Sequence, residues 1–246
     1  MVVPNKNIRK TILNMVNSSG AGHIGAALSS VEILNTIYKN VDISKIKTSD
    51  ISHDRVIFSK GHATSCLYAV MHHHGLLSKS LIDTYFKNNT TLAGHASHHV
   101  PFVEHSTGGL GHGLSVGVGI TIGMRSKKIN SKVFVVLGDG EMQEGSNWEA
   151  IMLAGHLKLE NLTIFIDINE LGQVGKLENS CSLEPLAQKF ESFNFDVFDI
   201  DGHDEEKLDL AIKKSFISKK PTAILCRTVK GYGISFMEKN NLWHYK

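Results

Sequence analysis

Apolar runs that alternate with amphipathic stretches are the feature that most limits the fold of this chain. Five short runs read as strands, at 55–59, 132–137, 161–168, 194–200 and 221–228. Most of their residues are apolar in succession, which is typical of a parallel sheet that helices cover on both faces. We therefore expect an α/β fold with a doubly wound, mainly parallel sheet, in a single domain of residues 1–246.

Helical spacing of apolar residues predicts helices between these strands. The ranges are 5–17, 30–40, 61–74, 78–87, 144–158, a segment near 183–191, and 204–216. The glycine-rich segment 106–124 is expected to begin as a loop and to continue as a buried helix. The residues expected on the apolar face of the 144–158 helix are Trp148, Ile151, Met152 and Leu153. In such folds ligands bind beyond the carboxyl ends of the strands, so the residues that follow each strand are the candidates for function.

Composition and charge argue against several classes of protein. A formal net charge of +2 over 246 residues is too small to indicate a nucleic-acid or membrane partner. No apolar stretch approaches the roughly 20 residues of a membrane span, and the N-terminus has no apolar signal core. The three cysteines, Cys66, Cys181 and Cys226, argue against a disulfide framework and are expected to be small buried side chains. We expect a cytoplasmic protein.

The tripeptide Gly138-Asp139-Gly140 ends one predicted strand, and Asn169 ends the next, with 28 residues between Gly140 and Asn169. Oxygen-bearing side chains at two successive strand ends suit a hard cation such as Mg²⁺. Together with one backbone carbonyl they leave coordination positions for phosphate oxygens and water. The pattern therefore predicts a diphosphate bridged by Mg²⁺, and the alternative is an ordinary turn capped by Asp139.

Longer blocks make the pattern more specific. GDGEMQEGSNWEA followed by NLTIFIDIN resembles the thiamine-diphosphate motif of transketolases. Further blocks occur in transketolase order over nearly the whole chain: SSGAGHIGAALS (18–29), DRVIFSKGHA (54–63), GHAS (94–97), STGGLGHGLSVGVG (106–119) and CRTVKGYGISFMEKNNLWH (226–244). The chain resembles the N-terminal, diphosphate-binding subunit of a split transketolase.

This resemblance implies thiamine diphosphate as the cofactor, with Mg²⁺ or another divalent cation such as Ca²⁺ or Mn²⁺. The implied metal ligands are Asp139, Asn169 and the carbonyl of Leu171. The implied cofactor-binding residues are His62, Gly108, Leu110, Gly138, Asp139, Gly140, Asn169 and Lys230. Of these, Gly138 and Gly140 would let the backbone approach the diphosphate.

The resemblance also assigns residues to the substrate and the partner. His23, His95 and His244 would line the substrate channel, where a pKa near neutrality suits proton transfer. Glu144 would join a buried acidic network between paired active sites. We interpret His72, His73 and His74 as a solvated helix end and His156 as structural, whereas His98, His99 and His105 are left open between substrate ligands and surface residues.

The sequence departs from the family at four places. GHAS stands where the family has Gly-His-Pro and an acidic residue, and NELGQVGK follows the second strand end where the family has Gln and then Asp-Gly. His112 replaces a Gln, and the sequence ends at WHYK where the family continues. The altered GHAS loop and the extra histidines leave open a transketolase for an unusual or branched sugar.

The implied activity is the transfer of a two-carbon ketol unit from a ketose donor to an aldose acceptor. In the family a Glu on a pyrimidine-binding domain is needed, and no such domain is visible in this sequence. We therefore expect a separate C-terminal subunit, an α2β2 assembly, and a sugar phosphate or nucleotide-sugar substrate. The alternatives are the α subunit of a 2-oxo acid dehydrogenase and a non-catalytic regulatory or scaffold subunit.

Overall fold

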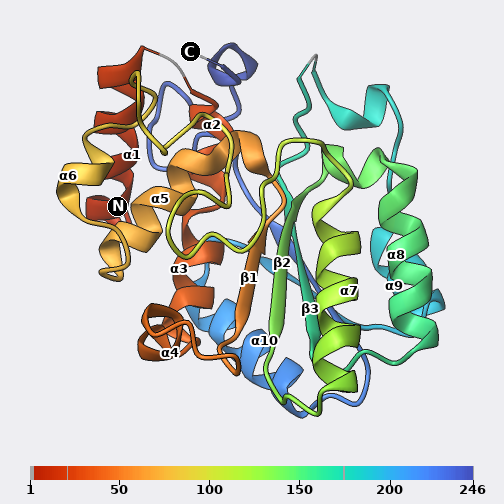
Figure 1. The fold of residues 1–246 in the computed structure, drawn as a ribbon. Coiled ribbons are helices and arrows are strands. Elements are labelled where there is room, and N and C mark those ends of the chain that lie inside the picture. Colours follow the sequence, from red (N-terminus) through yellow and green to blue (C-terminus); the bar gives the residue numbers. More distant parts are fainter. Residues whose placement is uncertain (1–2, 21, 174, 246) are drawn as a thin grey trace.

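A parallel five-stranded sheet forms the centre of the computed structural model, which describes residues 3–20, 22–173 and 175–245 (Figure 1). The strands are β1 (Arg55–Phe58), β2 (Val133–Gly138), β3 (Leu162–Ile168), β4 (Asp196–Asp201) and β5 (Thr222–Arg227), and their order in the sheet is β1-β2-β3-β5-β4. Every neighbouring pair is parallel. All the carboxyl ends therefore meet at one edge of the sheet.

Helices cover both faces of the sheet, as expected for a doubly wound fold (Figure 1). On one side of the sheet lie α1 (Lys6–Ser19), α2 (Ile24–Ser29), α3 (Val31–Lys39), α5 (Thr64–His73) and α10 (Glu205–Ile217), with α1 packed on α5 and α2. The other packs against α7 (Gly113–Ser126), α8 (Gly145–His156) and α9 (Leu186–Ser192). The short helices α4 (Ile43–Lys47) and α6 (Lys79–Ile82) lie on the side of the first group.

The central strands are buried on both faces, which explains their continuous apolar sequence. Every residue of β2 and β3 is buried. Strand β4 differs because it lies at the edge of the sheet, where its polar residues reach solvent. Within the described residues, no helix is long and apolar enough to cross a membrane.

Several expectations were wrong in detail. The helix expected at 78–87 ends at Ile82, because the chain then turns and Phe86 adopts a left-handed φ of 58°. The helices α2 and α4 were not expected. On α8, Met152 and Leu153 are exposed at 56% and 43% instead of lying on the apolar face. The buried face consists of smaller residues and one isoleucine: Asn147, Ala150, Ile151, Ala154 and Gly155.

Other side-chain expectations have mixed outcomes. Cys66 and Cys226 are buried, but Cys181 is exposed on the segment that follows β3. Trp148 packs against the core on the α7–α9 side. At the end of α5, His73 is exposed, whereas His72 and His74 are half-buried. His72 contacts the carbonyl oxygen of Leu77, and His74 contacts Asn35 Oδ1.

Candidate active site

The residues predicted for the cofactor and substrate gather around one cavity of about 450 Å³ at the carboxyl edge of the sheet. The first lining group comprises His23, His62, His95, Gly108 and Leu110, and the second comprises Gly138, Asp139, Gly140, Asn169, Leu171, Lys230 and His244. Gly138 ends β2, and the others come from the segments that follow β1, β2, β3 and β5, from the loop between α6 and α7, and from the start of α2. Segments far apart in the sequence are thus brought to a single site.

Asp139 is anchored between the ends of β2 and β3. It is only 5% exposed, and its carboxylate accepts hydrogen bonds from Gly140 N at 2.8 Å and Glu170 N at 2.6 Å. Burial, followed by the charge of Asp167, raises the pKa of Asp139 to about 6. A buried carboxylate in this setting is stabilised by a nearby cation.

Oxygen atoms suited to a divalent cation lie on the segment after β3. Asn169 Oδ1 accepts from Leu171 N at 3.2 Å, which forms a tight turn at this strand end. Leu171 O accepts from the ammonium of Lys230 at 3.0 Å, so this carbonyl already contacts a positive charge. Carboxylate, amide and carbonyl oxygens form the donor set that Mg²⁺ and Ca²⁺ take, so the residues fit such an ion.

Lys230 reaches this site from the segment after β5. It is 1% exposed, and besides Leu171 O its Nζ lies 3.3 Å from Gly172 O and 2.7 Å from His244 Nδ1. Burial, followed by the charge of Lys60, lowers the pKa of Lys230 to about 8. The ammonium lies where it would meet an anion in the cavity.

Histidines form one side of the cavity. The ring centroid of His23 lies 5.1 Å from that of His62, 5.4 Å from that of His244 and 6.2 Å from that of His95. Burial is the main cause that lowers the pKa of His23 and of His244 to about 4, and it holds the pKa of His62 well below its usual value. These three rings are therefore neutral at pH 7, so each offers one donor and one acceptor to a polar ligand.

Gly108 is needed for the packing of His95. Its φ of 139° is in the region that favours glycine, and a Cβ there would lie 2.9 Å from His95 Cδ2.

The glycines of the Gly-Asp-Gly tripeptide have more space around them than Gly108. Among the described residues, a Cβ at Gly138 or Gly140 would meet only ordinary contacts at 3.5 Å and 3.6 Å. The packing of the described residues therefore does not require glycine at these two positions.

A buried ion pair beneath the cavity was not found from the sequence. Lys60 Nζ contacts Asp167 Oδ2, and these side chains are 2% and 0% exposed. Ser29 and Ser30 donate to the same carboxylate oxygen at 2.7 Å and 2.8 Å. The pair spans the end of β2 and connects the segment after β1 to the end of β3. The one available signal was a lysine directly after the first strand, in SKGHA.

Glu141 is a second residue that sequence reasoning missed. It is 2% exposed, and its carboxylate accepts from Ser59 Oγ, from Gly111 N at 3.1 Å and from Gly138 N at 3.2 Å. It thereby connects the ends of β1 and β2 to the loop before α7. An acid directly after Gly-Asp-Gly was the available signal.

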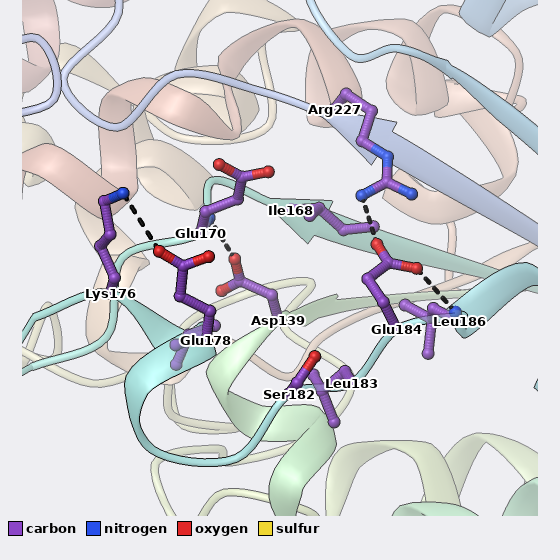
Figure 2. Close-up of a pocket in the computed structure, with 11 residues that line it drawn as sticks. Asp139, Ile168, Glu170, Lys176, Glu178, Ser182, Leu183, Glu184, Leu186 and Arg227 are labelled. Carbon is purple, nitrogen blue, oxygen red and sulfur yellow. Dashed lines mark hydrogen bonds and ion pairs between the residues drawn. The ribbon is translucent and has the colours of Figure 1, made fainter.

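An adjacent cavity of about 360 Å³ shares Asp139 with the site (Figure 2). Two ion pairs form between residues that line this cavity: Arg227 with Glu184 at 2.7 Å, and Lys176 with Glu178 at 3.1 Å. The positive charges that line this cavity are therefore already paired with carboxylates.

Some predicted residues lie apart from the main cavity. Glu144 is exposed at the start of α8 and is not covered by the described residues. His98 and His99 are exposed in the loop after His95, and His98 Nδ1 lies 2.7 Å from Ser106 Oγ. His156 is exposed at the end of α8. The roles of these residues stay predictions.

Solved structures define the class of this fold. Transketolase from Campylobacter jejuni superposes with a TM-score of 0.91 at 29% identity, over 97% of this chain and 39% of that chain. Transketolase from Leishmania mexicana gives a TM-score of 0.88 at 26% identity, over 97% of this chain and 38% of that one. The chain thus spans about two fifths of these transketolases and has the fold of one of their α/β domains.

Sequence comparison gives the family. A model described as the thiamine diphosphate binding domain of transketolase matches residues 4–244, and the chain belongs to this family. One of its relatives, a subunit of the apulose-4-phosphate transketolase from Phocaeicola vulgatus, is 36% identical over 241 residues, covering 96% of this chain and 85% of the relative. The 6-deoxy-6-sulfo-D-fructose transketolase subunit SqwG from Clostridium sp. is 34% identical over 234 residues, covering 94% and 85%.

Proposed function

We propose that this chain is the N-terminal subunit of a split transketolase and transfers a two-carbon ketol unit together with a separate C-terminal subunit. The observation that carries the proposal is the single cavity in which the oxygens of Asp139 and Asn169 lie with the histidine cluster. The relatives named as subunits, matched over most of their length, support the split arrangement. Neither a 2-oxo acid dehydrogenase subunit nor a scaffold has comparable support.

We propose that Asp139, Asn169 and the Leu171 carbonyl hold a divalent cation. With this cation they would hold the diphosphate of thiamine diphosphate, and the cofactor would supply the carbanion chemistry of the reaction. His62 would donate a hydrogen bond to a diphosphate oxygen, and Lys230 would lie close to the same group. Gly138 and Gly140 leave space for the diphosphate, while Gly108 and Leu110 would contact the aminopyrimidine.

The sugar would bind above the cofactor, against His23, His95 and His244. The pKa values of His23 and His244, both lowered to about 4, leave neutral rings that donate one hydrogen bond and accept another. Such rings suit hydrogen bonds to sugar hydroxyls, whereas the near-neutral pKa expected for proton transfer is not found for His23 and His244 in the free chain. The two relatives are named for ketoses with a phosphate or sulfonate end, so we propose an anionic ketose as the donor.

The partner would contact α8. Glu144 immediately precedes this helix, and the exposed residues Glu149, Met152, Leu153 and His156 follow at helical spacing on one face. A partner that buries Glu144 would also cover Met152 and Leu153. We propose an α2β2 assembly in the cytoplasm, in which this chain contributes one cofactor-binding domain of residues 1–246.

The test is an assay of ketol transfer by the chain alone and with a separate transketolase C-terminal subunit. Activity is expected only with both subunits, thiamine diphosphate and Mg²⁺. Asp139→Asn should weaken Mg²⁺-dependent cofactor binding, measured by calorimetry, by about tenfold or more, because a charged ligand is lost. Asp209→Asn on α10 is the matched control. Full activity of the lone chain, or unchanged cofactor binding by the Asp139 variant, would contradict the proposal.

A further inference from the structure

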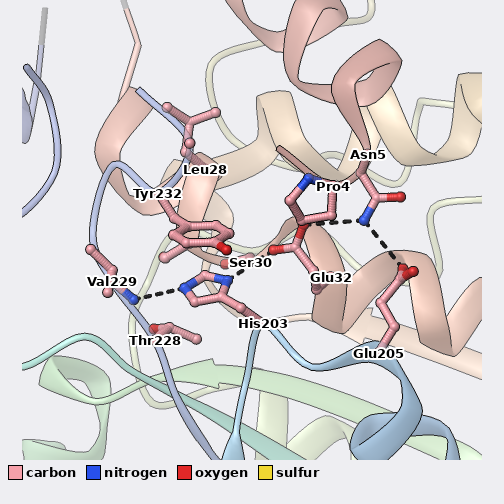
Figure 3. Close-up of polar contacts among 12 residues, drawn as sticks. Pro4, Asn5, Leu28, Ser30, Glu32, His203, Glu205, Thr228, Val229 and Tyr232 are labelled. Atoms are coloured by element: carbon pink, nitrogen blue, oxygen red, sulfur yellow. Dashed lines mark hydrogen bonds and ion pairs between the residues drawn. The ribbon is translucent and has the colours of Figure 1, made fainter. Parts of the chain in front are cut away.

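A buried polar network connects α1, α3 and the loop after β4 to the segment that carries Lys230 (Figure 3). At its centre, Arg9 forms an ion pair with Glu32, and these side chains are 3% and 0% exposed. Glu32 also accepts from Asn5 Nδ2 at 3.1 Å. Its second carboxylate oxygen lies 2.9 Å from Nδ1 of His203, a side chain that is 8% exposed.

The hydrogen bonds of His203 fix its tautomer. The backbone N–H of Val229 donates to His203 Nε2 at 2.9 Å. A backbone N–H is always a donor, so Nε2 is the unprotonated nitrogen and the ring proton is on Nδ1. Nδ1 therefore donates to Glu32, and a single neutral ring connects a buried carboxylate to the backbone of Val229.

The same ring also supports the residues on either side of Lys230. The ring of Tyr232 stacks on it with centroids 3.6 Å apart and planes inclined by 17°. Tyr232 O accepts from Arg9 Nη1 at 3.0 Å, and the loop that holds His203 is itself fixed because His203 N donates to Asp201 Oδ1 at 2.9 Å. Val229 and Tyr232 flank Lys230, so the network fixes the backbone from which its ammonium reaches the cavity.

We propose that His203 is a positioning residue for cofactor binding: as an Nδ1–H tautomer fixed by Glu32, it accepts the Val229 amide and holds Lys230 in place to meet the cofactor diphosphate. This inference rests on the role proposed above for Lys230. His203 itself does not line the main cavity, so it acts through the segment from Val229 to Tyr232. The physical basis is preorganisation, since a lysine already held in place loses less freedom when the anion binds.

Two substitutions separate the two bonds of the ring. In His203→Asn the amide nitrogen takes the place of Nδ1, so the bond to Glu32 is kept and the acceptor for Val229 is lost. In His203→Gln the longer side chain brings an amide oxygen to the place of Nε2, so the Val229 bond is kept and Glu32 loses its donor. An unpaired buried carboxylate oxygen costs more than an unpaired amide, so His203→Gln should be the less stable variant.

The experiment measures thiamine diphosphate affinity with Mg²⁺ by calorimetry, using the chain assembled with its C-terminal subunit, and thermal unfolding of the same samples. His203→Asn should raise the Kd about fivefold or more, which is the weight of one hydrogen bond, while His203→Gln stays within about twofold of the wild type. The unfolding midpoint should instead be lower in His203→Gln than in His203→Asn. Exchange of the Val229 amide in the free chain should accelerate only in His203→Asn, and His73→Asn on the exposed end of α5 should change none of these readings.

The outcomes distinguish the inference from the proposed function. If the wild-type assembly fails to bind thiamine diphosphate, the proposed function fails, and the inference fails with it. If the wild type binds but the two variants raise the Kd equally, His203 has only a structural role and the inference alone is overturned. The same holds if the less stable variant is the one with the higher Kd.

Discussion

At the residue scale, Glu141 shows how a buried acid connects the segments that form the site. Its two carboxylate oxygens accept from one hydroxyl and two backbone amides, on Ser59, Gly111 and Gly138. In Glu141→Gln one oxygen becomes an NH₂ group that faces a donor. We expect the variant to lose about 1–3 kcal/mol of unfolding free energy, measured with urea. Glu191→Gln on the exposed side of α9 should change the unfolding free energy by less than about 0.5 kcal/mol, and equal losses in both would contradict this role.

His23 gives a pH prediction for the free chain. Burial first, and then the charges of His244, His95 and Lys230, lower the pKa of His23 to about 4 in the folded chain, whereas the unfolded value is about 6.5. As the pH falls from about 6.5 to about 4, the unfolded chain takes up a proton that the folded chain refuses. The contribution of His23 to the unfolding free energy is therefore complete above pH 6.5 and is lost as the pH falls through this window.

The measurement is the urea midpoint of the wild type and of His23→Gln at several pH values from 7.5 to 4.5. The unfolding free energy of the wild type minus that of His23→Gln should fall as the pH falls. Asp139, with its raised pKa of about 6, gives the opposite slope, but it is present in both proteins and cancels in the difference. Parallel curves for the two proteins would show that His23 is not shielded in solution.

At the scale of the elements, two helical glycines differ in whether a side chain would fit beside them. A Cβ on Gly155 of α8 would lie 1.8 Å from the carbonyl oxygen of Phe193, whereas among the described residues a Cβ on Gly123 of α7 would meet nothing within 4 Å. We expect Gly155→Ala to cost at least about 2 kcal/mol of unfolding free energy through overpacking. Gly123→Ala should stabilise the isolated chain by about 0.5–1 kcal/mol through helix propensity. Urea unfolding of both variants checks the pair, and a stable Gly155→Ala would refute the close packing of α8 on the segment before β4.

The elements also show how far the sequence predicts the fold. Continuous apolar runs identified the strands, and parallel pairing of β2 with β3 then placed Asp139 beside the strand end that carries Asn169. Two short helices escaped notice because six residues of α2 and five of α4 are too few to show a period. The outward face of α8 was misjudged because the sheet accepts small residues there, which leaves the large Met152 and Leu153 outside.

The site was predictable where chemistry is local and unpredictable where it depends on tertiary contacts. The Gly-Asp-Gly tripeptide and the histidines after glycines lie in short motifs, and the structure brings them together around one cavity. The pair of Lys60 and Asp167 joins residues 107 positions apart, and the bond of His203 to Glu32 spans 171. Nothing in the spacing of such residues indicates that they meet, because the sheet order decides it.

At the scale of the whole molecule, the exposed face of α8 is where the assembly can be tested apart from the chemistry. Met152 is 56% exposed on the helix that follows Glu144, outside the main cavity. Met152→Lys places a charge in the proposed interface, where burying it unpaired is costly. We expect the variant to fold with an unchanged unfolding midpoint but to lose association with the C-terminal subunit by about tenfold or more, measured by analytical ultracentrifugation.

The control for this prediction is Leu210→Lys on α10, whose side chain is 55% exposed on the opposite side of the sheet. It makes the same change of charge and should leave association intact. Because the assembly is proposed to complete the active site, ketol transfer in Met152→Lys should recover as the partner concentration is raised, which distinguishes lost association from damaged catalysis. Normal association of the Met152 variant, or equal loss in both variants, would move the interface away from α8 and leave the exposure of Glu144 without its proposed explanation.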